Sequence, residues 1–150
     1  PIATAESGGH EWRFRVEPPA AGWMKPQFDD SGWRKGRGSF GSRGTPGAIV
    51  GTRWDRPDIW LRTRFTIEDP KAIAGGTWRI HHDEDVEVYL NGKKVFEAGG
   101  YITDYIDIPL APAALEALQQ GENVVAVHCR QTVGGQNIDL GLTLTRSVVR

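Results

Sequence analysis

The stretch W-R-I-H-H-D-E-D-V-E-V-Y-L-N-G-K-K-V, from Trp78 to Val95, decides the fold of this chain. Apolar and polar residues alternate on both sides of its acidic turn, as they do on half-buried β-strands. Asn91-Gly92 supplies the positive φ angles that a two-residue hairpin turn needs. The stretch therefore predicts a strand, an acidic turn, a second strand, a tight turn and the start of a third strand.

The same period of two divides each expected strand into a core face and an opposite face. The residues predicted to face the core are Leu61, Thr63, Phe65, Ile67, Trp78, Ile80, His82, Val86, Val88, Leu90, Val125, Val127, Cys129, Leu140, Leu142 and Leu144. The residues predicted to face away are Trp60, Arg62, Arg64, Thr66, Arg79, His81, Glu87, Tyr89, Val124, Ala126, His128 and Arg130.

The rest of the chain predicts turns, loops and little helix. Residues 1–9 are expected to be a loose lead-in, 10–16 a weak first strand, 22–33 an irregular aromatic segment and 36–51 a long glycine-rich loop. Residues 113–120 form the helical stretch, which Gly121 ends. Short strands separated by turns predict an all-β fold over residues 1–150: one antiparallel β-sandwich with one short helical turn.

Composition excludes several classes of protein. The 150 residues suffice for one domain with a full core, and 18 basic against 19 acidic residues give a net charge of −1 that favours neither nucleic acid nor membrane as a partner. The single Cys129 excludes an internal disulfide framework. Because the chain opens at Pro1 without an initiator Met or a signal segment, we expect it to be a piece of a larger multidomain protein.

Four short motifs resemble the N-terminal sugar-binding domain of glycoside hydrolase family 2 enzymes. They are F-D-D-S-G-W (28–33), I-W-L-R-T-R-F (59–65), V-E-V-Y-L-N-G (86–92) and G-E-N-V-V-A-V (121–127). Residues 81–92 and 126–141 are also similar to the accessory β-sandwich domain of glutaminase-A-type secreted proteins. The resemblance implies a galactose-binding-like jelly roll that is non-catalytic and attached to a catalytic domain.

This resemblance, with the residues predicted to face away from the core, favours a carbohydrate-binding module of a secreted or periplasmic glycoside hydrolase. Its partners would be a polysaccharide or oligosaccharide and the catalytic domain of the same parent chain. Aromatic rings stack on sugar rings, and polar side chains hydrogen-bond the hydroxyls. Several polar residues, Asp139 among them, are expected to converge on one outer sheet surface. The candidate site residues are Trp54, Trp60, Arg62, His82, Tyr89, Tyr101, His128, Gln131 and Asp139.

Two alternatives remain open at this point. The outer polar face could instead be an interface of a structural accessory domain that packs on its catalytic neighbour without binding sugar. The less favoured alternative is a small hydrolase that uses a pair of carboxylates among Asp83, Glu87 and Asp139.

Neither a cofactor nor a metal is expected. The motif G-x-G-x-x-G at 36–41 has no hydrophobic strand before it and no helix after it, so it predicts a plain loop and no nucleotide site. The carboxylates of Asp83, Glu84 and Asp85 could hold calcium, but a hard-cation site needs six or more oxygens from several loops. A solvated acidic turn is the favoured interpretation.

Overall fold

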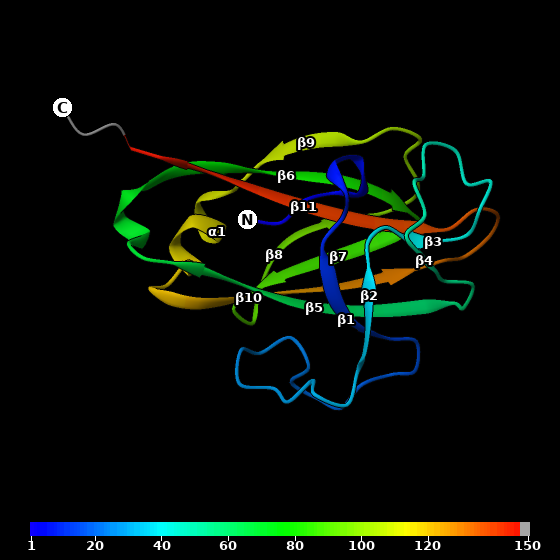
Figure 1. Ribbon diagram of the computed structural model, residues 1–150, viewed down its shortest axis with the longest axis horizontal. Helices are drawn as coiled ribbons and strands as arrows, with labels where there is room; N and C mark the ends of the chain where they lie inside the picture. The colour runs from blue at the N-terminus through cyan, green and yellow to red at the C-terminus, as the bar shows by residue number, and fades with distance from the viewer. Residues whose placement is uncertain (148–150) are drawn as a thin grey trace.

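The computed structural model describes residues 1–147, which fold into two β-sheets packed face to face (Figure 1). The six-stranded sheet runs in the order β2 (Arg34–Arg37), β1 (Glu11–Arg15), β5 (Asp58–Ile67), β10 (Gly121–Arg130), β7 (Asp85–Leu90) and β8 (Lys93–Ala98). The five-stranded sheet runs in the order β4 (Thr52–Arg53), β3 (Phe40–Gly41), β11 (Asn137–Arg146), β6 (Ile73–Asp83) and β9 (Ile106–Pro109). The predicted all-β sandwich is confirmed.

Neighbouring strands pair antiparallel, except that β3 and β4 pair parallel. The one α-helix, α1, spans Pro112–Ala117, and two 3-10 turns cover Ala5–Ser7 (η1) and Pro70–Ala72 (η2) within the described residues. None of the helices in residues 1–147 is long and apolar enough to cross a membrane.

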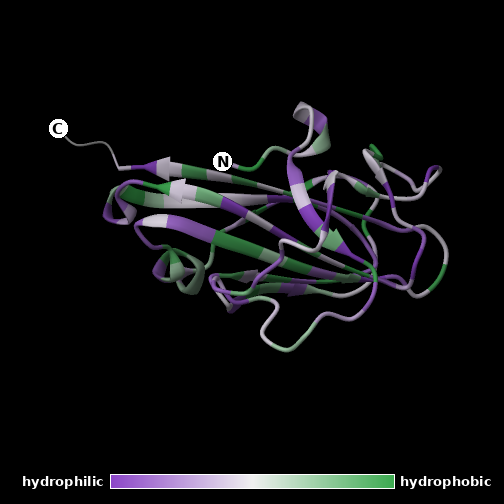
Figure 2. Cartoon of the chain, turned by 60° about the horizontal axis from the view of Figure 1, so that its bottom comes forward, coloured by the Kyte–Doolittle hydropathy of each residue, from purple (hydrophilic) through white to green (hydrophobic). Residues whose placement is uncertain are grey.

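The core lies between the two sheets and is built from the faces that the period of two assigns to it. Hydrophobic and hydrophilic residues alternate along the strands in Figure 2. Among the residues predicted to face the core, Leu144 is half-buried and the following are buried: Leu61, Thr63, Phe65, Ile67, Trp78, Ile80, His82, Val86, Val88, Leu90, Val125, Val127, Cys129, Leu140 and Leu142. The hairpin turn between β7 and β8 is also confirmed, because Asn91 and Gly92 have φ angles of 51° and 87°.

Two expectations about loops are wrong. The glycine-rich stretch 36–51 includes the end of β2 and all of β3, so the long loop is confined to residues 42–51, and residues 38–39 join the two strands. Gly36 pairs with Trp12 in the ladder between β1 and β2, and glycine is required there because a Cβ would lie 2.9 Å from the rings of Phe14 and Phe40. The lead-in is ordered rather than loose: Ile2 forms a bridge with Leu142 of β11, and η1 follows it.

Each sheet has an outer face that the chain covers in part. The N-terminal segment and residues 42–51 and 101–105 cover the outer face of the five-stranded sheet, where Pro46 and Tyr105 contact the buried His81. A long irregular stretch, residues 17–33, leaves β1 and crosses the outer face of the six-stranded sheet before β2 begins (Figure 1). We call residues 17–33 the covering loop.

Candidate functional site

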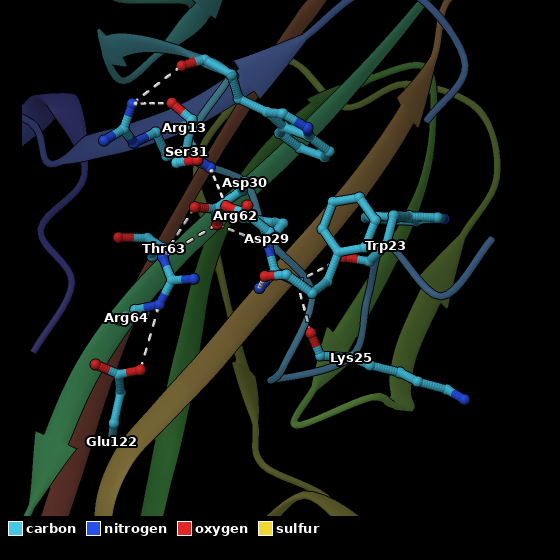
Figure 3. A network of polar contacts seen from close by, with 12 residues as sticks. Arg13, Trp23, Lys25, Asp29, Asp30, Ser31, Arg62, Thr63, Arg64 and Glu122 are labelled. Atoms are coloured by element: carbon cyan, nitrogen blue, oxygen red, sulfur yellow. Dashed lines mark hydrogen bonds and ion pairs between the residues drawn. The ribbon is translucent and has the colours of Figure 1, made fainter. Parts of the chain in front are cut away.

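The covering loop is held on the outer face of the six-stranded sheet by Arg62, a fully buried residue of β5 (Figure 3). Nε of Arg62 donates a hydrogen bond of 2.7 Å to Oδ2 of Asp30, itself buried. The remaining guanidinium nitrogens donate to the backbone carbonyls of Trp23, Lys25 and Phe28. Burial lowers the pKa of Arg62, and the hydrogen bond and charge of Asp30 oppose that shift. Arg62 is thus a structural anchor, and its side chain is closed to a ligand.

A groove of about 550 Å³ opens on the same face, over strands β7, β8 and β10. The groove is open to solvent, and charged side chains line it. Its lining comprises Asp85, Val86, Glu87, Glu97, Ala98, Gly99, His128 and Arg130. Arg130 is exposed and takes part in no ion pair among residues 1–147. Its donors are therefore free for a ligand.

His128 forms the floor of this groove in a fixed orientation. Its Nε2 lies 2.8 Å from Oδ1 of Asp58, and its Nδ1 lies 3.5 Å from Oε1 of Glu87. The ring stacks on Trp60, with centroids 4.7 Å apart and an interplanar angle of 5°. The cross-strand register explains this arrangement, because His128 is paired with both Glu87 and Trp60. The imidazole is thus positioned before any ligand arrives.

Glu87 connects this floor to the rim of the groove. Its Oε2 accepts hydrogen bonds from Nζ of Lys94, at 3.0 Å, and from the hydroxyl of Tyr89, at 3.3 Å. Burial raises the pKa of Glu87, but the contacts with Lys94 and His128 outweigh it and lower the pKa overall. Glu87 is therefore ionised at neutral pH and acts as a hydrogen-bond acceptor, whereas a general acid needs a raised pKa.

The four aromatic residues expected to stack on sugar lie in different environments. Trp54 is 1% exposed and belongs to the core, and Trp60 is 7% exposed beneath His128. Tyr89 is half-buried and meets Trp23 of the covering loop edge to face. Tyr101 is 67% exposed but lies on a loop that bridges to Asp83. The structure therefore presents no single stacking platform made by these four residues.

The polar candidate residues also lie in different parts of the structure. Arg62 and His128 share the outer face of the six-stranded sheet, whereas His82 is buried, with its Nδ1 donating to the carbonyl of Glu84 at 2.7 Å. Gln131 is half-buried and donates through its side chain to the carbonyl of Gly134. Of the nine candidates, Trp60, Tyr89 and His128 lie together beside the groove. The binding role of each remains a prediction.

Asp139 lies on β11 and faces outward from the other sheet, so the expectation that it shares one surface with the outward residues of β7 and β10 is wrong. Its Oδ2 accepts hydrogen bonds from the backbone N–H of Ala5 and from the hydroxyl of Tyr105, at 2.8 and 2.6 Å. Burial raises the pKa of Asp139 to about 6, although these hydrogen bonds lower it. The period of two shows which residues of a strand face the core and which face outward. It does not show which of the two sheets the strand joins.

The carboxylates considered for hydrolysis are divided between the two sheets. Glu87 faces outward from the six-stranded sheet, whereas Asp83 and Asp139 belong to strands of the five-stranded sheet. Asp139 is committed to Ala5 and Tyr105. Glu87 is therefore apart from the other two carboxylates, and the groove that Glu87 lines includes neither Asp83 nor Asp139.

The acidic turn uses its carboxylates to tie loops together. Glu84 accepts hydrogen bonds from the backbone N–H groups of Thr132 and Val133, and Asp85 accepts one from Gly100. No group of three or more His, Cys, Asp or Glu residues within residues 1–147 is placed to hold a metal ion. The expectation that no metal is bound stays a prediction. The hydrogen bonds that Glu84 and Asp85 accept from loop backbone groups support it.

We expect metal removal to leave the domain unchanged. Treatment with EDTA, or addition of millimolar calcium, should shift the melting temperature by less than about 1 °C, since a ligand that does not bind the native state cannot stabilise it. Differential scanning calorimetry measures this shift. A rise in melting temperature with calcium that Asp85→Asn abolishes would contradict the prediction.

Several residues in or next to the groove could not be identified from the sequence. Glu97 and Asp58 carry no motif, and they reach this site only because β8 and β5 lie one and two strands away from β7. Trp23 is visible as an aromatic anchor in the sequence, but its contact with Tyr89 depends on the path of the covering loop. Strand order, which period-two patterns do not encode, was the missing information.

No protein-family model and no curated protein matches this sequence. Solved structures do match. A glycosyl hydrolase family 2 member from Bacteroides cellulosilyticus superposes with a TM-score of 0.62 at 18% identity, covering 90% of this chain and 20% of that one. The fold is one found in glycoside hydrolase family 2 structures. The resemblance drawn from the sequence motifs is therefore confirmed at the level of the fold.

Two further structures give the same result. A β-glucuronidase from Bacteroides uniformis has a TM-score of 0.64 at 20% identity, with 92% of this chain and 17% of that chain covered. A β-glycosidase from Bacteroides vulgatus has a TM-score of 0.57 at 22% identity, with 90% and 20% covered. The chain thus spans about a fifth of the length of each of these glycosidases.

Proposed function

We propose that this chain is a non-catalytic accessory domain of a secreted or periplasmic glycoside hydrolase, and that it binds carbohydrate in the groove over β7, β8 and β10. Two observations support the accessory role: the fold occurs in glycoside hydrolase family 2 structures, and the chain spans only about a fifth of those proteins. The catalytic domain of the parent chain would then be its permanent neighbour.

The groove itself is the observation that carries the carbohydrate proposal. It combines an open shape with two polar groups, His128 and Glu87, that are held in place by neighbouring side chains, and such preorganisation lowers the entropic cost of binding. Arg130 offers guanidinium donors, and Glu97 and Asp85 offer carboxylate acceptors, all suited to sugar hydroxyls. With Trp60 buried under His128, hydrogen bonds would contribute more than stacking, so the expected affinity is modest.

Binding to immobilised neutral glycans tests this proposal. We expect specific retention of the wild-type domain and roughly tenfold weaker binding for Arg130→Ala, because one hydrogen-bonded charged group would be lost. Lys71→Ala is the matched control, since Lys71 is an exposed cation on η2 and does not line the groove. Equal binding by both variants and the wild type would contradict a site in the groove.

A second candidate function rests on a different surface. Ile49, Tyr101 and Val133 are 48%, 67% and 75% exposed and belong to loops at one end of the sandwich. These loops contact one another: Thr45 donates a hydrogen bond to the carbonyl of Gln136, and Gly47 lies directly against the carbonyl of Thr103. Exposed apolar side chains on adjoining loops are typical of an interface. They favour packing of this end on a neighbouring domain, with or without sugar binding in the groove.

A further inference from the structure

A row of arginines follows the open edge of the sandwich, where β2 of one sheet faces β4 of the other. Two hollows lie there, of about 570 and 360 Å³, and Arg53 lines both. Arg43 lines the first hollow, and Arg34 and Arg56 line the second. We call Arg34, Arg43, Arg53 and Arg56 the basic edge. Because Arg53 belongs to both hollows, the four guanidinium groups border one continuous surface.

The positive charge of the basic edge is only partly neutralised by the protein. Two carboxylates line the hollows, those of Glu17 and Asp55. Asp55 lies 3.0 Å from Arg53, but both side chains are largely exposed, and an exposed pair of this kind is weak. Among residues 1–147, no ion pair involves Arg34, Arg43 or Arg56. A local excess of cations therefore exists in a chain whose net charge is −1.

Arg34 is positioned by the fold. It is the cross-strand partner of Phe14, and its guanidinium carbon lies 4.7 Å from the centre of that ring. The aromatic face holds the cation at the edge of the sandwich without using its N–H donors. A planar guanidinium whose donors stay free is suited to bidentate recognition of a carboxylate or sulfate group.

We propose that the basic edge binds an anionic glycan through its carboxylate or sulfate groups. The guanidinium groups would meet these charged groups, and the side chain of Ser42, which lines the first hollow, would meet hydroxyls. A nucleic acid fits less well, because single strands are bound by stacking on exposed aromatic rings. Trp54, the one aromatic residue lining the two hollows, is buried.

This inference is independent of the groove over β7, β8 and β10. That groove is lined by Asp85, Glu87 and Glu97 against Arg130 as its one lysine or arginine, so a polyanion would be repelled there. The two surfaces should therefore select glycans of different charge. Failure of one proposal would leave the other in place.

Affinity electrophoresis through gels containing polygalacturonate, dextran sulfate or neutral dextran tests the basic edge. We expect the wild-type domain to be retarded by at least one of the two anionic polymers and not by dextran. Polygalacturonate alone would indicate carboxylate recognition, and dextran sulfate alone would indicate sulfate recognition. The double variant Arg34→Gln/Arg53→Gln should bind roughly five- to tenfold more weakly, since two surface ion pairs are removed.

The matched control is Lys71→Gln/Lys93→Gln. It also removes two positive charges, but at exposed positions outside the hollows. It should bind the polyanion as the wild type does. Equal weakening in both double variants would overturn the proposal, because net charge alone would then explain binding. Equal retardation by polyglutamate or single-stranded DNA would overturn its glycan specificity, and no retardation by either anionic polymer would overturn it entirely.

Discussion

Replacement of Arg62 by alanine is expected to lower the free energy of unfolding by about 3–5 kcal/mol, the range found when one partner of a buried ion pair is removed. The loss is large because Asp30 would stay buried without its partner, and the carbonyls of Trp23, Lys25 and Phe28 would lose their donors. Urea unfolding followed by tryptophan fluorescence measures the change. The covering loop should also become sensitive to chymotrypsin after Trp23 or Phe28.

Arg64 offers a matched comparison on the same strand. It contacts the same carboxylate, at 3.0 Å from Oδ2 of Asp30, but its side chain is 32% exposed. Arg64→Ala should therefore cost less than about 1 kcal/mol. Arg62→Lys should not rescue stability, because an ammonium cannot reproduce the fork of donors that reaches four acceptors. Equal effects of Arg62→Ala and Arg64→Ala would contradict the role given to Arg62.

Replacement of Asp139 by asparagine is expected to raise the stability of the domain at pH 8 and leave it unchanged at pH 4. The pKa of this carboxyl is raised to about 6 in the folded state from its ordinary value of 3.8, chiefly by burial. The folded state therefore holds the proton more tightly than the unfolded state does. Stability from this group is fully present below pH 4 and is lost as the pH rises to 6.

The size of the effect follows from the shift. About two pKa units correspond to roughly 2–3 kcal/mol at pH 8, and asparagine can still accept hydrogen bonds from Ala5 and Tyr105. The difference between the unfolding free energies of variant and wild type, measured at each pH, isolates this carboxyl from the other titrating groups. Asp104→Asn, at an exposed position, serves as the control. A difference that does not change between pH 4 and pH 8 would contradict the prediction.

Much of the fold was predictable because it depends on local patterns. The alternation along residues 86–90 and the dipeptide Asn91-Gly92 determine a hairpin without help from distant residues. The errors occur where tertiary contacts decide. The glycine-rich pattern predicts a loop at Gly36, but this residue pairs with Trp12 of β1, and glycine is needed there because the rings of Phe14 and Phe40 occupy the space of a side chain.

The candidate site was harder to predict because it depends on strand order and on one loop. Tyr89 and His128 were placed on an outer face correctly, since the period of two is sufficient for that. Arg62 has the same outward orientation, yet the covering loop buries it. Asp139 fits the outward pattern too, but its strand belongs to the other sheet. The sequence pattern predicts that a side chain points outward, but it does not show that the side chain is accessible to a ligand.

The most direct test of the central claim is a titration of the isotope-labelled domain with neutral oligosaccharides, followed by two-dimensional NMR. Carbohydrate binding in the groove predicts saturable shifts of the backbone amides around Glu87, Glu97 and Arg130. It also predicts that Arg130→Ala reduces these shifts while the amides around Lys71 do not move. Unchanged spectra across a broad panel of neutral glycans, or shifts confined to the loops of Ile49 and Val133, would contradict a carbohydrate site in the groove.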